Sequence, residues 1–66
     1  MSSLDSIKLF CDVAQQRSIS KAAELNGVTQ PAASQRMMAL ESELGVQLLD
    51  RSHRPLQLTE PGEDYY

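Results

Sequence analysis

The stretch from Thr29 to Gly45, TQPAASQRMMALESELG, decides the fold because it predicts one helix with both ends marked. Thr29 is a suitable N-cap, and Pro31 fits the first turn, where its missing N–H costs no hydrogen bond. Gly45 suits the position after the helix, because glycine adopts the left-handed conformation without strain. We therefore expect a helix over Gln30–Leu44.

This helix has an apolar stripe and a polar face. At 100° per residue, the stripe that should meet a core comprises Ala33, Met37, Leu40 and Leu44. The opposite face carries Pro31, Gln35, Met38 and Ser42, with Ser34 at its edge. Its N-terminal end favours an acidic partner, because the helix dipole is positive there and free N–H groups point outward. An ordinary amphipathic helix with a solvated polar face fits the same pattern.

Size and composition limit the class of protein. Sixty-six residues allow one domain with a small core, and an aromatic content of 5% requires that core to be aliphatic. A single cysteine excludes an intrachain disulfide, and no Cys–His cluster has the spacing of a zinc site. The chain has neither a run of 18 apolar residues nor a signal-peptide pattern. We expect a cytoplasmic protein with no membrane partner.

The charge distribution is more informative than the net charge. A net charge of −3 and a pI near 4.8 argue at first sight against nucleic-acid binding. However, residues 17–36 hold three basic side chains against one acid, and residues 51–55 hold two with none. The basic residues are Arg17, Lys21 and Arg36 in the first island and Arg51 and Arg54 in the second. If the fold brings them together, these islands can contact phosphates while the acidic segments face elsewhere.

Two helices are expected before residue 29. Ser3 can cap a helix over Leu4–Gln16. Its apolar stripe comprises Leu4, Ile7, Phe10, Cys11 and Ala14, with Val13 beside it. Because Cys11 lies within this stripe, we expect a buried, inert thiol.

A shorter helix, Lys21–Leu25, is expected after the connection Arg17-Ser18-Ile19, with Ser20 as its cap and Ile19 in the core. It ends at Asn26-Gly27, so a turn of about four residues containing glycine separates it from the next helix, as in a helix-turn-helix. In that motif the N-terminal residues of the second helix contact base edges in the major groove.

The C-terminal third predicts a hairpin. Val46–Asp50 is apolar, with Leu48 and Leu49 as strand or core candidates, and Leu56–Leu58 alternates with the period of a strand. The polar, basic segment between them, residues 51–55, would form the tip. A hairpin beside a helix-turn-helix is a wing. Thr59 can cap one further helix, with Pro61 in its first turn.

Taken together, these segments resemble a known family. The runs SISKAAELNGVTQPAASQRMMALESELGVQLLDR (residues 18–51) and PLQLTEPG (residues 55–62) are similar to the N-terminal domain of LysR-type transcriptional regulators. The resemblance covers residues 4 to 64. Its markers are Ala22-Ala23, Gln30-Pro31-Ala32, Ser34, Leu40-Glu41, Leu44-Gly45, Leu48, Arg51, Leu58-Thr59 and Gly62.

The resemblance implies a mainly α, winged helix-turn-helix fold with three helices, a two-stranded β-hairpin wing and the start of a linker helix. Residues 1–58 would be the DNA-binding domain and residues 59–66 a stub of the linker helix, with the effector-binding domain absent. It further implies a bacterial transcription regulator that binds double-stranded promoter DNA as a dimer formed through the linker helix. A small-molecule effector would bind the missing domain.

The resemblance also implies DNA contacts. Base contacts carry over onto Gln30, Pro31 and Ser34 in the recognition helix, and backbone contacts onto Arg51 and Arg54 around the wing. The family often has arginine directly after the serine, whereas this chain has Gln35 there. Glutamine can read adenine through N6 and N7, so we expect a base contact from Gln35 as well.

Three basic residues keep alternatives open. One residue corresponds to 100° around a helix, so Arg36 leaves the groove-facing side and meets either a phosphate or an intramolecular acid. Lys21 is a further candidate for a phosphate contact. Arg51 either contacts the DNA backbone or braces the wing by pairing with Asp50 or a helix carbonyl.

The sequence also bears on two other functional classes. A winged-helix module that binds proteins would suit the acidic balance. The sequence does not favour an enzyme, because its one histidine, His53, lies in a predicted loop and no glycine-rich phosphate loop occurs. We therefore expect no catalytic residue, cofactor or metal.

Overall fold

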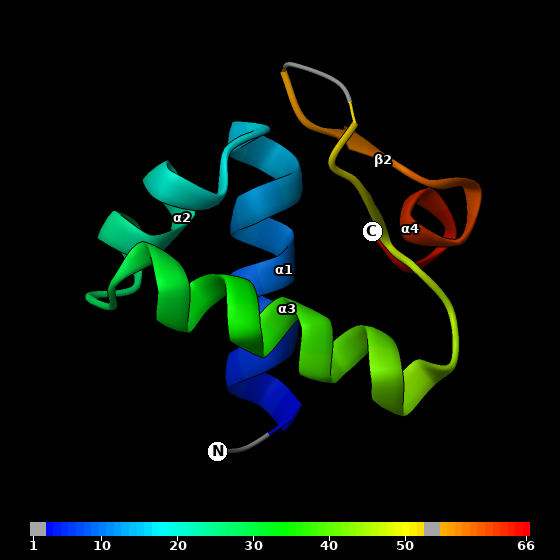
Figure 1. Cartoon of the computed structure of the whole chain (residues 1–66), viewed down its shortest axis with the longest axis horizontal. Coiled ribbons are helices and arrows are strands. Elements are labelled where there is room, and N and C mark those ends of the chain that lie inside the picture. The colour runs from blue at the N-terminus through cyan, green and yellow to red at the C-terminus, as the bar shows by residue number, and fades with distance from the viewer. Residues whose placement is uncertain (1–2, 53–54) are drawn as a thin grey trace.

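The computed structural model describes residues 3–52 and 55–66 (Figure 1). Three helices are followed by a two-stranded hairpin and a short fourth helix. The elements are α1 (Ser3–Gln16), α2 (Ile19–Leu25), α3 (Gln30–Leu44), β1 (Leu49–Asp50), β2 (Gln57–Leu58) and α4 (Glu60–Tyr65). This architecture confirms the predicted fold. Of the residues singled out in the sequence, His53 and Arg54 lie outside the described part of the chain.

The first three helices meet around one apolar core. In Figure 1, α3 crosses α1, α2 lies at the N-terminal end of α3, and the hairpin and α4 lie on the other side of the molecule. The buried residues of the core come from all three helices and from the segment that enters β1. They are Leu9, Phe10, Val13, Ala22, Ala23, Ala33, Met37, Leu40, Leu48 and Leu49. Alanine at three of these positions lets α2 and α3 approach their neighbours closely.

The central helix has the predicted bounds. The Thr29 hydroxyl accepts a hydrogen bond from the backbone N–H of Ala32 at 3.3 Å, and Gly45 ends the helix with φ of 73°. Met37 and Leu40 are buried as expected, whereas Leu44 is half-buried against the core. Both ends of α3 are therefore set by local chemistry, and its stripe faces α1 and α2.

The apolar stripe of α1 is rotated from the predicted one. The helix already includes Ser3, so Ser3 does not precede it as a cap. Ile7 is 49% exposed and Cys11 is half-buried, whereas Leu9 and Val13 are completely buried. The predictions for Ile7 and for a buried Cys11 thiol are therefore wrong. Two overlapping stripes share Phe10 and Ala14, and the positions of α2 and α3 select the one that includes Leu9.

The second helix begins two residues earlier than predicted. Ser18, not Ser20, is the N-cap: its backbone is extended, and its hydroxyl accepts a hydrogen bond from the Lys21 N–H at 3.2 Å. Ile19 packs against the core from the first position of α2. Burial of Ile19 thus favours a helix start at residue 19 and leaves Ser20 exposed in the first turn.

The hairpin and α4 form one unit. β1 and β2 are antiparallel, with Leu49 opposite Leu58. Thr59 caps α4 as predicted, since its hydroxyl accepts from the Gly62 N–H at 3.0 Å. The same hydroxyl donates to the Gln47 carbonyl, and the Thr59 N–H donates to the Leu48 carbonyl at 3.0 Å. These bonds dock the start of α4 against the segment that enters β1.

The close approach of α4 requires glycine at position 62. Gly62 is buried, and a Cβ placed there would overlap the Leu48 carbonyl oxygen and lie 2.9 Å from its carbonyl carbon. Both groups belong to the backbone, so neither can move aside without disturbing the entry to β1.

We predict that Gly62→Ala destabilises the domain by about 1–3 kcal/mol, because the added methyl overpacks a backbone contact. Helix propensity alone predicts that Gly62→Ala stabilises the domain, since alanine is favoured over glycine in a helix by about 0.8–1 kcal/mol. Urea unfolding followed by circular dichroism measures the difference. A variant as stable as the wild type, or more stable, would show that the contact does not constrain the fold.

Candidate nucleic-acid interface

A groove separates the N-terminal half of α3 from the wing. It has a volume of about 460 Å³ and combines residues from the start of α2, from α3 and from both sides of the hairpin. Its lining residues are Arg17, Ser18, Ile19, Ser20, Gln30, Ser34, Arg51, Pro55 and Leu56. Hydroxyl, amide and guanidinium groups dominate this set, so the groove can donate several hydrogen bonds and carries positive charge.

A second hollow continues along the outer face of α3. Ser34 and Arg51 line both hollows, which therefore adjoin. The other residues of the second are Met38, Glu41, Ser42, Gly45, Val46 and Gln47. Met38 is 60% exposed, so a large apolar side chain lies beside the polar end of the helix.

The structure brings together only part of the predicted site. Gln30, Ser34 and Arg51 line the same groove. Pro31 and Gln35 are exposed on α3 but line neither hollow.

The remaining basic candidates lie apart from that groove or outside the description. Lys21 borders a separate depression with Gln16, Glu24 and Leu25. Arg36 is half-buried and has no acidic partner among the described residues, so the intramolecular alternative for Arg36 is not found there. Arg54 lies outside the described residues.

Arg17 also lines the groove, although its sequence position predicted only membership of a basic island. It follows α1 with φ of 53°, the one positive φ among the described non-glycine residues. This left-handed turn ends α1 and leads the chain into the cap of α2. Arg17 also borders a depression formed with β2, the two residues before it, and Glu63 of α4. The sequence signal that could have placed Arg17 in the groove is its position directly before Ser18. Once Ser18 is recognised as the N-cap of α2, Arg17 lies beside the start of that helix.

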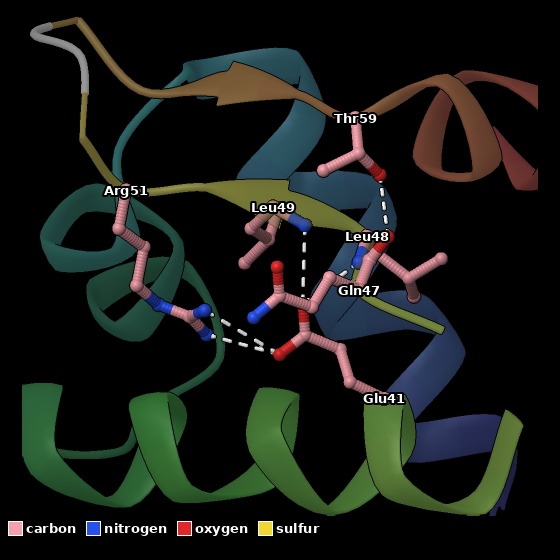
Figure 2. A network of polar contacts seen from close by, with 6 residues as sticks. All are labelled: Glu41, Gln47, Leu48, Leu49, Arg51 and Thr59. Atoms are coloured by element: carbon pink, nitrogen blue, oxygen red, sulfur yellow. Dashed lines mark hydrogen bonds and ion pairs between the residues drawn. The ribbon is translucent and has the colours of Figure 1, made fainter. Parts of the chain in front are cut away.

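Arg51 pairs with Glu41, not with Asp50 or a helix carbonyl (Figure 2). Both terminal nitrogens of Arg51 lie 3.4 Å from Glu41 Oε1. The other carboxylate oxygen, Oε2, accepts hydrogen bonds from the backbone N–H groups of Leu48 at 2.8 Å and Leu49 at 3.1 Å. Bracing was one of the two alternatives left open for Arg51, and the partner found, Glu41, was not among those predicted. Asp50 instead accepts hydrogen bonds from the backbone and hydroxyl of Ser52.

A second polar network braces the turn between α2 and α3. The Asn26 side chain donates to the Ala22 carbonyl at 2.7 Å and to Asp12 Oδ2 at 2.9 Å. Lys8 donates both to Asp12 at 2.9 Å and to the Asn26 side-chain oxygen at 3.2 Å. Hydrogen bonds from Lys8 and then Asn26 lower the pKa of the Asp12 carboxyl below its ordinary value. The turn before α3 is therefore fixed to α1.

Other kinds of site have no support in the described part of the chain. None of its helices has the length and apolarity needed to cross a bilayer. Among the same residues, no three His, Cys, Asp or Glu side chains are grouped so as to hold a metal ion.

Three helices with a wing, and a polar groove beside the second helix of the helix-turn-helix, define a winged helix-turn-helix domain. Residues 4–63 match the family described as bacterial regulatory helix-turn-helix protein, lysR family. The chain belongs to this family, which confirms the resemblance found in the sequence.

The relatives are longer proteins. The chain is 44% identical over 61 residues to the uncharacterised transcriptional regulator YfeR of Shigella flexneri. This match covers 92% of the present chain and 20% of YfeR. Across the first curated relatives it matches, the chain spans about a fifth of their length.

Solved structures agree with the fold. The DNA-binding domain of BenM in complex with benA site 1 DNA has a TM-score of 0.93 and 37% identity, with 98% of this chain and 73% of that chain covered. Vibrio fischeri DarR in complex with DNA has a TM-score of 0.94 and 37% identity, with 98% and 22% covered.

We predict that Asp12→Asn lowers stability at neutral pH and that the loss disappears in acid. The folded carboxyl binds a proton less readily than the unfolded one, so its contribution is present above the ordinary pKa of 3.8 and is lost as pH falls through the lower, folded value. Thermal unfolding between about pH 7 and about pH 2.5 measures this difference. Lys8→Gln removes the largest cause of the lowered Asp12 pKa, so in that background the pH dependence of the Asp12→Asn effect should be smaller. A stability gap that is equal at both ends of the range would contradict the prediction.

Proposed function

We propose that this domain binds double-stranded DNA in a sequence-specific manner, with α3 in the major groove and the wing near the backbone. One observation carries the proposal: the N-terminal end of α3 presents Gln30 and Ser34 to a groove that also holds Arg17 and Arg51. Amide and hydroxyl groups can read base edges, and flanking guanidinium groups can neutralise phosphates. Net charge alone does not oppose this, because two of the basic side chains, Arg17 and Arg51, line that groove.

Within this proposal the residues divide into two groups. Gln30, Pro31, Ser34 and Gln35 contact bases, with Gln35 able to form paired hydrogen bonds to adenine. Contacts to the DNA backbone come from Lys21, Arg36, Arg51 and Arg54. Helix termini and basic side chains of this kind fix the register of a protein on the duplex without reading sequence.

The proposal is supported by relatives whose structures were determined with DNA, namely the BenM domain with benA site 1 and DarR. By the same likeness we propose that residues 1–58 are the DNA-binding unit and that α4 begins a linker helix. A full-length regulator would then form oligomers through that helix and bind an effector in another domain. This role in transcription requires no catalysis, cofactor or metal from the domain.

A second candidate function is a winged-helix module that binds another protein. The net charge of −3 favours it, as does the exposure of Leu25 and Met38. The two candidates differ in their response to DNA and salt, which makes them separable in one experiment.

We predict that the domain binds a mixed-sequence duplex weakly and that affinity falls steeply with salt. Each neutralised phosphate contributes about −0.9 to the slope of log affinity against log salt concentration, because binding releases counterions. Fluorescence anisotropy titrations at two or more salt concentrations give this slope. Absence of binding, or a flat salt response, would favour the protein-binding alternative.

We predict that Gln35→Ala and Lys21→Ala differ in kind. Loss of a base contact should weaken binding to a selected site by about 1–3 kcal/mol and relax the preference at one base pair, whereas loss of a phosphate contact should weaken all sequences alike. Titrations with a duplex selected from a random pool, and with a scrambled duplex, measure both effects. Equal losses on the two duplexes for Gln35→Ala would remove this residue from the base-reading group.

A further inference from the structure

We propose that Glu41 is a positioning residue for DNA binding, which sets the place of Arg51 beside the recognition helix. This inference rests on the proposed function. Glu41 lies on the C-terminal half of α3 and belongs to neither group of predicted DNA contacts. Its carboxylate nevertheless links α3 to the wing, because it accepts hydrogen bonds from the backbone of Leu48 and Leu49 and pairs with the guanidinium of Arg51 (Figure 2).

The two oxygens of Glu41 are held differently. Oε2 accepts two short hydrogen bonds from the consecutive N–H groups of Leu48 and Leu49, at 2.8 and 3.1 Å. These donors belong to buried residues, and the Glu41 side chain is only 10% exposed. Because the donors are fixed by the core, the carboxylate has one orientation, with Oε1 directed toward Arg51.

Arg51 is held less tightly. Its two terminal nitrogens lie 3.4 Å from Oε1, beyond the usual hydrogen-bond distance, and its side chain is 36% exposed. The fixed carboxylate therefore orients the guanidinium without burying it. In this orientation Arg51 lines both hollows together with Ser34, at the point where they adjoin.

This arrangement lowers the cost of a phosphate contact. A free arginine side chain samples many rotamers and must be immobilised when it binds, which reduces affinity. Glu41 restricts those rotamers before binding, and the long Oε1 contacts leave guanidinium N–H groups available to a second acceptor. Repulsion between this carboxylate and the DNA is reduced, because two backbone N–H groups and the Arg51 guanidinium already stabilise its negative charge.

Glu41→Gln separates positioning from folding. The amide oxygen can still accept from the N–H groups of Leu48 and Leu49, whereas the amide nitrogen cannot accept from Arg51. Amide hydrogen exchange at Leu48 and Leu49 reports whether the entry to β1 remains intact. Glu43→Gln is the matched control, since it removes the same charge from an exposed position of the same helix.

The experiment is a double-mutant cycle with the whole chain: wild type, Glu41→Gln, Arg51→Gln and the double variant, each titrated with a duplex selected from a random pool. We expect Glu41→Gln to weaken binding about tenfold when Arg51 is present and less than about twofold when it is not, the signature of coupled residues. Glu43→Gln should leave affinity unchanged or raise it slightly in both backgrounds.

Two results would overturn the inference. An equal effect of Glu41→Gln in both backgrounds would show that Glu41 does not act through Arg51. A gain in affinity that requires Arg51 would show that Glu41 withholds the guanidinium instead of presenting it. Failure of the wild type itself to bind any duplex would reject the proposed function, and that result is seen in the wild-type titration alone.

A measurement on the unsubstituted chain covers the case in which Glu41→Gln fails to fold. Nuclear magnetic relaxation of arginine side-chain nitrogens compares Arg51 with Arg17, which has no ion pair among the described residues. We expect the Arg51 guanidinium to be the more restricted of the two. Equal mobility would contradict the positioning role without any substitution in the wing.

Discussion

The structure depends on the burial of one face of α3 against α1 and α2. Ala33 and Met37 are almost completely buried, and Leu40 nearly so. Because the helix turns 100° per residue, fixing this stripe in the core also fixes which side chains stand on the opposite side. The polar end of α3, the groove beside it and the path of the chain into β1 all follow from that single packing constraint.

The wing is attached to this helix by polar contacts in addition to the burial of Leu48 and Leu49 in the core. Its strands are only two residues each, too short to be stable alone. Among the described residues, two polar connections add to this burial: the Glu41 carboxylate accepts the N–H groups of Leu48 and Leu49, and Thr59 bonds to the Gln47 and Leu48 carbonyls. Side chains outside the two strands therefore help to place a hairpin of this size.

Local chemistry explains what the sequence predicted correctly. The ends of α3 and the start of α4 depend on Thr29, Gly45 and Thr59, each of which acts on backbone groups within a few residues. Gln30 and Ser34 could be placed at an exposed helix end for the same reason.

Features that depend on distant partners were predicted less well. Two stripes on α1 were compatible with the pattern, and only the packing of α2 and α3 selects the one with Leu9 over that with Ile7. Ser20 was predicted to cap α2, whereas Ser18 does so, and Ile19 packs against the core from the first position of the helix. The ion pair between Glu41 and Arg51 joins residues ten positions apart, on either side of a turn. A helix or strand period therefore does not predict it. These errors lie in tertiary contacts, whereas the fold class rests on patterns within single elements.

Asn26 has a mechanical consequence for recognition. Its side chain ties α1 to the end of α2, at the first residue of the connection before α3, so bending at that point would break these hydrogen bonds. If this part of the domain keeps its shape on binding, the adjustment must come from the other molecule. For a duplex, that cost depends on the stiffness of each base step. Discrimination by this domain would then include base pairs that no side chain touches.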